Sequence, residues 1–167
     1  MSDKPEICRA EKADLQEIQT LIRATWHATY DPVHGHDKMH ELSKVWHNLD
    51  RLNQDLAREN SRFLIMRQRD QIIATAFVYE KPGKVIIGRV YVHPLRQNSG
   101  LGTLLMQDIM QEIKDSSEIS LTVEPENIGA IRFYERYGFK IEGPGSCSED
   151  PHDDIPTQIM VRKPHQS

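Results

Sequence analysis

Residues 92–102 combine two glycines, an arginine and the start of an apolar helix, which is a pattern suited to phosphate binding. The segment reads Val92-His93-Pro94-Leu95-Arg96-Gln97-Asn98-Ser99-Gly100-Leu101-Gly102. The first backbone N–H groups of a helix lack intrahelical acceptors and carry a partial positive charge, so they can hold a diphosphate. Gly100 and Gly102 have no Cβ atom to block that approach, and Arg96 is a candidate charge partner. The alternative is that both glycines only punctuate a loop between a strand and a helix.

Two other phosphate-binding motifs are disfavoured by residue identity. A dinucleotide-binding fingerprint would require a third glycine at position 105, which is Leu105. A Walker A loop would require Gly-Lys followed by serine or threonine, and the sequence contains no such tripeptide.

A second segment, residues 127–139, places a tyrosine on a short helix. It reads Asn127-Ile-Gly-Ala-Ile-Arg-Phe-Tyr134-Glu-Arg-Tyr-Gly138-Phe139. Asn127 is a good N-cap, and Gly138 with Phe139 resembles a C′ glycine followed by its hydrophobic contact. Tyr134 is either a core aromatic residue or a proton donor. The two segments together suggest a pyrophosphate cradle facing a tyrosine, as an enzyme that uses an acyl-CoA would need.

Apolar periodicity predicts the helices and strands that position these segments. A helix is expected to start at the capping pattern Asp14-Leu-Gln-Glu17 and to break at Asp31-Pro32 and Gly35. A second helix follows from Met39 to Leu49, which Leu52 and Leu56 could extend. Further helices are expected at 100–114 and after Asn127. Strands are expected at 7–10, 62–67, 72–79, 85–92, 119–123, 139–142 and 155–161, with a tight connection at 68–70.

Length and composition restrict the class of protein. The chain has 167 residues, 38% hydrophobic and 28% charged, so we expect a single domain over 1–167. A net charge of −4 without a lysine or arginine block argues against nucleic-acid binding. Cys8 and Cys147 lie far apart with no CxxC pair, which fits a reducing compartment, and no apolar run could span a membrane. A cytoplasmic protein is therefore expected.

Both segments resemble the signatures of the GNAT superfamily of acetyl-CoA-dependent N-acetyltransferases. Residues 97–102 match the Arg/Gln-x-x-Gly-x-Gly/Ala pyrophosphate loop, and Val92-x-Pro94 matches its usual approach. Residues 127–139 match the second family signature. The resemblance covers residues 85–143 and fits the element order of the whole chain. It implies an α/β fold of the GNAT type, in which helices flank a twisted mixed sheet of about six or seven strands.

The resemblance also implies where acetyl-CoA, the acetyl donor, binds. Strands 85–92 and 119–123 would splay apart to admit the pantetheine, whose amides would pair with the backbone near Tyr91 and Val92. A main-chain N–H there would act as an oxyanion donor to the thioester carbonyl. Asn127 would bond to the cofactor, or would cap its helix only. The diphosphate would contact Gln97, Asn98, Ser99, Gly100, Leu101, Gly102 and Thr103.

Direct transfer to an amine requires a general acid for the CoA thiolate and a general base for the amine. By its motif position, Tyr134 is the expected acid and is also expected to contact the cofactor. The base is left open, because strand 85–92 contains no carboxylate where better-understood members often place a glutamate. Glu124, His93 and a water relay are the candidates.

The acceptor pocket of this family is usually walled by the first two helices, here with Trp26 and Tyr30 as candidate contacts. His34, His36 and His40 could in principle hold a metal, but no fourth ligand is evident, so solvated histidines and no metal are expected. The acidic loop 149–154 could attract a cationic amine, or could be an ordinary soluble loop. The acceptor is expected to be the primary amine of a small molecule, amino acid or peptide. A non-catalytic acetyl-CoA-binding or regulatory domain, a larger acyl donor and a homodimer are left open.

Overall fold

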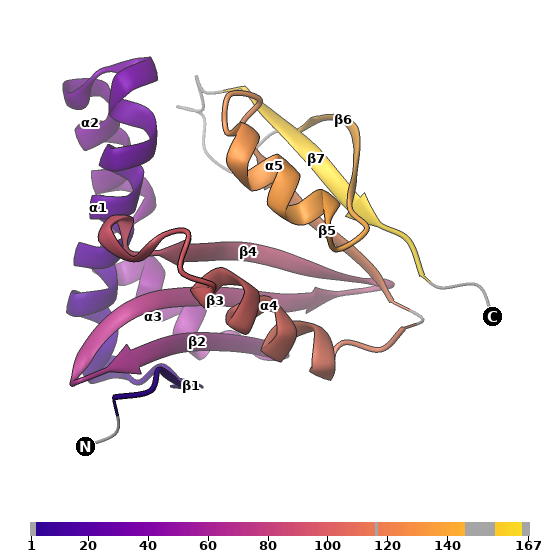
Figure 1. The fold of residues 1–167 in the computed structure, drawn as a ribbon, viewed down its shortest axis with the longest axis horizontal. Helices are drawn as coiled ribbons and strands as arrows, with labels where there is room; N and C mark the ends of the chain where they lie inside the picture. Colours follow the sequence, from indigo (N-terminus) through magenta and orange to yellow (C-terminus); the bar gives the residue numbers. More distant parts are fainter. Residues whose placement is uncertain (1–2, 116, 146–155, 165–167) are drawn as a thin grey trace. The chain divides into compact units, whose positions relative to one another are not determined.

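Seven strands form one mixed sheet in the order β1-β2-β3-β4-β5-β7-β6 (Figure 1). The computed structural model describes residues 3–115, 117–145 and 156–164. β4 and β5 pair in parallel, whereas β1–β2, β2–β3, β5–β7 and β6–β7 are antiparallel. The strands are β1 (Glu6–Arg9), β2 (Ser61–Gln68), β3 (Gln71–Lys81), β4 (Lys84–Val92), β5 (Glu118–Val123), β6 (Lys140–Gly145) and β7 (Thr157–Arg162). This sheet confirms the expected α/β fold.

The chain divides into two compact units, the first comprising Met1–Tyr79 with Arg89–Glu112 and the second comprising Glu80–Gly88 with Ile113–Ser167. The first unit contains four α-helices and two 3-10 turns, and the second contains α5. The helices are η1 (Lys12–Asp14), α1 (Leu15–His34), α2 (His36–Trp46), α3 (Leu49–Ala57), η2 (Pro94–Arg96), α4 (Leu101–Glu112) and α5 (Ile128–Glu135). None of the helices in the described ranges has the length and hydrophobicity of a transmembrane segment.

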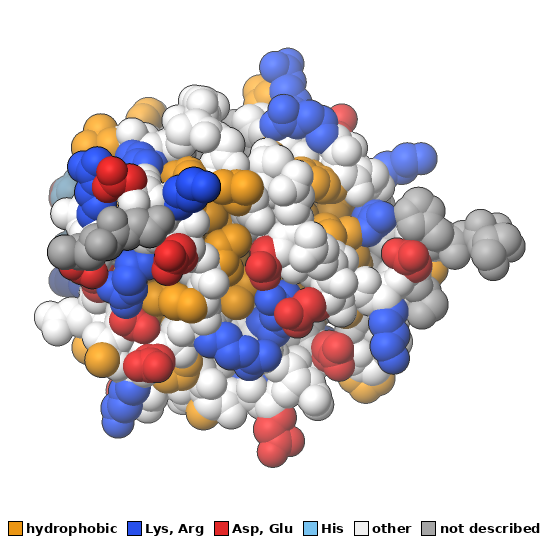
Figure 2. Space-filling model, turned by 60° about the horizontal axis from the view of Figure 1, so that its bottom comes forward, with side chains coloured by type: hydrophobic (Ala, Val, Ile, Leu, Met, Phe, Trp, Pro, Cys, Tyr) orange, Lys and Arg blue, Asp and Glu red, His pale blue; other side chains and the backbone are white. Residues whose placement is uncertain are grey.

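Each unit has its own buried side chains. In the first unit, α1, α2, α3, β2 and α4 all contribute to the core, so burial of one apolar face fixes each helix. Its largest fully buried side chains are Ile18, Ile22, Met39, Leu52, Ile65, Met66, Leu105, Met106 and Ile109. In the second unit the corresponding residues are Ile119, Phe139 and Met160. On the face shown in Figure 2, acidic and basic side chains are interspersed, as the sequence suggested.

α1 begins at Leu15 with Asp14 at its N-cap position, as the pattern predicted, but the Asp14 side chain makes no capping hydrogen bond there. The Asp14 side chain accepts a hydrogen bond from the Glu11 backbone N–H at 2.8 Å and pairs with Arg67 at 2.5 Å. Glu17 accepts a hydrogen bond from the Ile72 backbone N–H at 2.8 Å. Both carboxylates therefore stabilise contacts outside the first turn of α1, which local spacing could not reveal.

The predicted helix break at Asp31-Pro32 is wrong, because α1 continues through Pro32 to His34. Proline removes one backbone donor from a helix, and here that loss falls in the last turn. The helix ends at Gly35, which has φ +88° and donates its backbone N–H to the Asp31 carbonyl at 2.9 Å. Gly35, the other part of the predicted break, is thus confirmed as the point where α1 stops, and α2 begins immediately after it.

The second predicted helix is two helices, α2 and α3, which are separated at His47 and Asn48. The Asn48 side chain accepts a hydrogen bond from the Arg51 backbone N–H at 2.8 Å and caps α3. His47 is only 3% exposed and anchors the turn. Three α-helices rather than two therefore precede β2.

The predicted tight connection between β2 and β3 is confirmed. Gln68 pairs with Gln71, and the two residues between them, Arg69 and Asp70, have φ of 50° and 62°. Two consecutive positive φ values are typical of a two-residue hairpin turn.

Candidate active site

The glycine turn after β4 is built from two residues in the left-handed region. β4 leads into η2, whose start is capped by His93: its Nδ1 accepts a hydrogen bond from the Leu95 backbone N–H at 3.1 Å. Asn98 then has φ +62° and Gly100 has φ +85°. The Leu104 backbone N–H donates to the Gly100 carbonyl at 3.1 Å, which makes Gly100 the point where α4 starts.

Side chains in the turn maintain its shape. Gln97 Nε2 donates to the Val92 carbonyl at 3.1 Å, and the Ser99 hydroxyl donates to the Arg96 carbonyl. Arg96 donates to Gln68 Oε1 at 2.6 Å, which ties the turn to the β2–β3 hairpin. Gln97 and Ser99, both predicted to contact a diphosphate, thus also position the backbone that would do so.

The start of α4 can bind an anion through its main chain. The amides of Leu101, Gly102 and Thr103 precede the first intrahelical hydrogen bond of the helix, where backbone donors and the helix dipole favour negative charge. Leu101 is 5% exposed, so its buried side chain anchors this end of α4. A Cβ atom built at Gly100 would meet no heavy atom within 4 Å. The space where a side chain at Gly100 would begin is therefore open.

Three further predicted residues of the first unit form an aromatic group. Trp26 Nε1 donates a hydrogen bond to the Tyr91 hydroxyl at 2.8 Å, which links α1 to β4. The rings of Trp26 and Tyr30 meet edge to face with centroids 5.1 Å apart. Trp26 is 8% and Tyr30 9% exposed, values that favour a packing role for both. Contact of these residues with an acceptor stays a prediction.

In the second unit, Asn127 and Glu124 lie at the end of β5. The Asn127 side chain accepts a hydrogen bond from the Ala130 backbone N–H at 3.2 Å, so the predicted N-cap of α5 is confirmed. The Asn127 backbone N–H donates to the Glu124 carbonyl at 3.0 Å. Glu124 is 5% exposed, although a carboxylate is usually solvated.

Tyr134 lies on α5 in an aromatic environment. Its ring meets Phe133 and Phe139 edge to face at centroid distances of 5.3 and 5.8 Å, and Tyr134 is 9% exposed. The Phe139 backbone N–H donates to the Tyr134 carbonyl at 3.2 Å, and Gly138 has φ +89°, as predicted for a glycine C-cap. The chain reversal at Gly138 therefore fixes the ring of Tyr134.

The cap made by His93 limits its role as a base. A nitrogen that accepts a hydrogen bond has its lone pair in use, so neutral His93 carries its proton on Nε2. To take a proton from an amine, His93 would have to give up the cap of η2. This geometry favours Glu124 or a water relay, the other two candidates.

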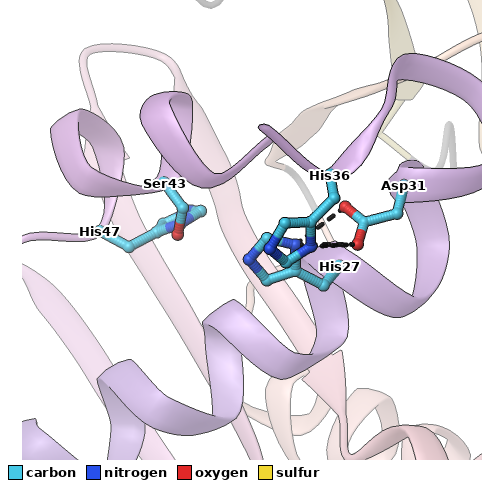
Figure 3. A network of polar contacts seen from close by, with 5 residues as sticks. All are labelled: His27, Asp31, His36, Ser43 and His47. Carbon is cyan, nitrogen blue, oxygen red and sulfur yellow. Dashed lines mark hydrogen bonds and ion pairs between the residues drawn. The ribbon is translucent and has the colours of Figure 1, made fainter. Parts of the chain in front are cut away.

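The sequence analysis missed a buried histidine between α2 and α3. Ser43 and His47 lie side by side (Figure 3), with His47 Nδ1 3.0 Å from the Ser43 hydroxyl. The His47 ring also meets the Trp26 ring, with centroids 4.7 Å apart. Burial, with smaller contributions from the charges of Arg89, Arg23 and Arg51, lowers the pKa of His47 to about 3. His47 is therefore neutral. In the sequence, the only sign of this burial is that His47 directly follows the regularly spaced apolar residues of α2.

The predicted site residues thus fall into two groups. The first unit holds Trp26, Tyr30 and the residues from Tyr91 to Thr103, and the second holds Glu124, Asn127 and Tyr134. Within each group the structure brings neighbouring members together through the contacts described above. The acidic loop 149–154 lies outside the described residues.

Known proteins resemble this chain in sequence and in fold. A sequence model of the Acetyltransferase (GNAT) family matches residues 16–139. Spermine/spermidine N(1)-acetyltransferase of Bacillus subtilis is 33% identical over 66 residues, which are 38% of this chain and 43% of that protein. The matched region thus spans less than half the length of that relative.

Two solved structures illustrate the likeness in fold. The PaiA N-acetyltransferase of Thermoplasma acidophilum, solved in complex with coenzyme A, has a TM-score of 0.80 and 21% identity. The comparison covers 96% of this chain and 99% of that one. The ribosomal-protein-S18-alanine N-acetyltransferase of Escherichia coli has a TM-score of 0.72 and 17% identity, with 98% and 96% covered.

Proposed function

Because this chain belongs to the Acetyltransferase (GNAT) family, whose members use acetyl-CoA, we propose that it transfers the acetyl group of acetyl-CoA to a primary amine. The observation that carries the proposal is the turn at the start of α4. Asn98 and Gly100 both have positive φ, and the amides that follow open a 12-residue helix. A turn of this kind can bind a diphosphate without a lysine cluster, and coenzyme A carries a diphosphate.

The proposed reaction is a direct transfer in a ternary complex. The amine nitrogen attacks the thioester carbonyl, a C–N bond forms and the C–S bond breaks. A base removes the proton from the attacking amine, and the departing thiolate takes a proton from Tyr134. A backbone N–H near Tyr91 or Val92 is the proposed donor to the carbonyl oxygen.

β4 supports this binding role by the way its pairing ends. It pairs with β5 only over Lys84–Ile86 and Glu118–Ser120, although β4 continues to Val92. Tyr91 and Val92 at its end are partly exposed. In the proposed mechanism, the amides of the pantetheine pair with the backbone at this end of β4.

The acceptor is proposed to be a small primary amine, with polyamines as the first class to test. The support is the 33% identity to a spermine/spermidine N(1)-acetyltransferase. Amino acids and peptide N-termini are the other acceptor classes.

Two observations favour a second candidate, a non-catalytic acetyl-CoA-binding domain. β4 contains no carboxylate, and the cap made by His93 occupies its acceptor nitrogen. A domain without an efficient base would bind the cofactor and acetylate nothing. A third candidate keeps the transfer but uses a larger acyl donor.

Two measurements on the full chain separate these candidates. Calorimetric titration with acetyl-CoA and with CoA measures binding alone, and an amine panel followed by release of free thiol measures transfer. The enzyme proposal expects both binding and amine-dependent thiol release. Binding without release for any polyamine, amino acid or peptide would favour the non-catalytic domain. Faster release with longer acyl-CoA donors would favour the larger acyl group.

A further inference from the structure

Three histidines lie together where α1 passes into α2, within the first unit. His27 belongs to α1, and His36 and His40 are four residues apart on α2. The rings of His27 and His36 stack with centroids 4.5 Å apart, and His40 lies 6.0 Å from His27 and 5.9 Å from His36. Each histidine offers one ring nitrogen such that the three nitrogens lie within 4.8 Å of one another.

Asp31 fixes the orientation of two of these rings. Its carboxylate lies 2.8 Å from His27 Nδ1 and 2.9 Å from His36 Nδ1, as Figure 3 shows. An ionised carboxylate only accepts hydrogen bonds, so both Nδ1 atoms carry hydrogen. The Nε2 lone pairs of His27 and His36 are thereby left to accept a ligand.

This arrangement is the one that metal-binding histidines use. In such sites the second ring nitrogen of the histidine donates to a carboxylate, which fixes the tautomer and raises the basicity of the ligating nitrogen. Neutral imidazole nitrogen is a preferred ligand of Zn²⁺ and of neighbouring divalent transition metals. Three histidines with water in the fourth position complete a tetrahedral site. The missing fourth protein ligand, which led the sequence analysis to expect no metal, is thus no obstacle.

We propose that His27, His36 and His40 bind a divalent transition-metal ion such as Zn²⁺, and that Asp31 positions His27 and His36. The site differs from the trio considered in the sequence, because His27 replaces His34. Only the continuation of α1 through Pro32 brings His27 and Asp31 next to α2.

Binding requires a small rearrangement that the exposure of the cluster permits. Nitrogens of a tetrahedral site with Zn–N distances near 2.0–2.1 Å are about 3.3 Å apart. The ligating nitrogens must therefore come closer together than 4.8 Å, the distance within which one ring nitrogen of each histidine now lies. The His36 side chain is 65% exposed and His40 is also exposed, so the His40 ring can turn, and His36 can shift while it keeps its hydrogen bond to Asp31, without disturbing the core.

Titration of the full chain with ZnCl2 in a calorimeter tests the proposal. We expect one ion per chain, and a loss of at least tenfold in affinity for His36→Ala and for His40→Ala. Asp31→Asn removes the charge that orients the rings, and a second-shell change of this kind costs about 10–100-fold in metal affinity. Asp37→Asn, at an exposed acidic residue next to His36, is the matched control and should retain the affinity.

A second measurement reports the ligands themselves. Co²⁺ added to the wild-type chain should give the visible absorption of a four-coordinate site, and His40→Ala should abolish it while the circular dichroism of the folded chain is retained. The proposal is overturned if the wild-type chain binds no Zn²⁺, if both histidine variants bind it as well as wild type does, or if Asp37→Asn loses as much affinity as they do.

Discussion

Gly100→Ala is the most direct perturbation of the turn at the start of α4. Gly100 has φ +85°, a conformation that side chains with a Cβ atom rarely adopt. The added Cβ atom would meet no heavy atom within 4 Å, so steric contact with the rest of the protein contributes nothing. The substitution therefore acts through the backbone conformation alone.

The size of the effect follows from the cost of the left-handed conformation. For a residue other than glycine this cost is about 1–2 kcal/mol. If the turn keeps its shape, the free energy of unfolding falls by that amount, and the melting temperature of a chain of this length falls by about 2–8 °C. If the turn relaxes instead, a ligand that needs the native turn must restore it at the same cost. The affinity for CoA would then fall by about 5–30-fold.

Gly83→Ala provides a control with the same backbone cost. Gly83 has φ +79° in the connection between β3 and β4, and a Cβ atom there also meets nothing within 4 Å. Thermal unfolding should show the full loss of stability for Gly83→Ala if its turn is kept, and a smaller loss for Gly100→Ala to the extent that its turn relaxes. Calorimetric titration with CoA should show weaker binding for Gly100→Ala and unchanged binding for Gly83→Ala.

Two results would refute this reasoning. Equal CoA affinity in wild type and Gly100→Ala, together with less than the expected loss of stability, would show that the turn has relaxed and that its native shape does not hold the diphosphate. Equal losses of affinity in both variants would show that the effect comes from general destabilisation.

Three further predictions concern other residues. Tyr134→Phe should lower kcat for thiol release by at least tenfold and leave CoA affinity unchanged, because only the transferable proton is lost. The pKa of His47 is about 6.5 in the unfolded chain and about 3 in the folded chain. The contribution of His47 to stability is therefore complete above pH 6.5 and is lost as the pH falls toward 3. The free energy of unfolding should fall by up to about 1.4 kcal/mol per pH unit in that range. Denaturant titrations at several pH values should show that the unfolding free energy of His47→Gln depends less steeply on pH. Asp55→Ala should destabilise the chain by about 1–3 kcal/mol, because it removes the carboxylate that lies 2.8 Å from the half-buried Arg89. Urea unfolding should show a smaller loss of stability for Asp55→Asn.

Local signals predicted the parts of the fold that depend on local interactions. The Asn127 cap, the Gly138 turn and the two-residue connection after Gln68 each need only a few neighbouring residues, and each is present. The apolar period of α4 and the β-branched run of β5 were sufficient for the same reason. The sequence therefore predicted the elements that carry both family signatures.

Predictions failed where a distant partner decides the structure. Glu17 bonds to the Ile72 backbone across 55 residues, so its spacing from Asp14 was misleading. Pro32 was expected to end α1, but the helix tolerates it in the last turn and stops at Gly35. That error placed a helix break between His27 and His36, so the sequence analysis did not identify Asp31 as a hydrogen-bond partner of both histidines.

The residues proposed to bind the diphosphate and those proposed to transfer protons have different expected effects on the kinetics. Residues near Gly100 belong to the first unit and are proposed to bind the diphosphate, which lies far from the reacting thioester within coenzyme A. Tyr134 and Glu124 belong to the second unit and are proposed to transfer protons. Changes at the turn should therefore raise KM and leave kcat nearly intact at saturation, because uniform binding is lost. Changes at Tyr134 should do the reverse. A large loss of kcat in Gly100→Ala at saturating acetyl-CoA would mean that the turn also aims the thioester, since binding energy remote from the reacting atoms can be used for their orientation.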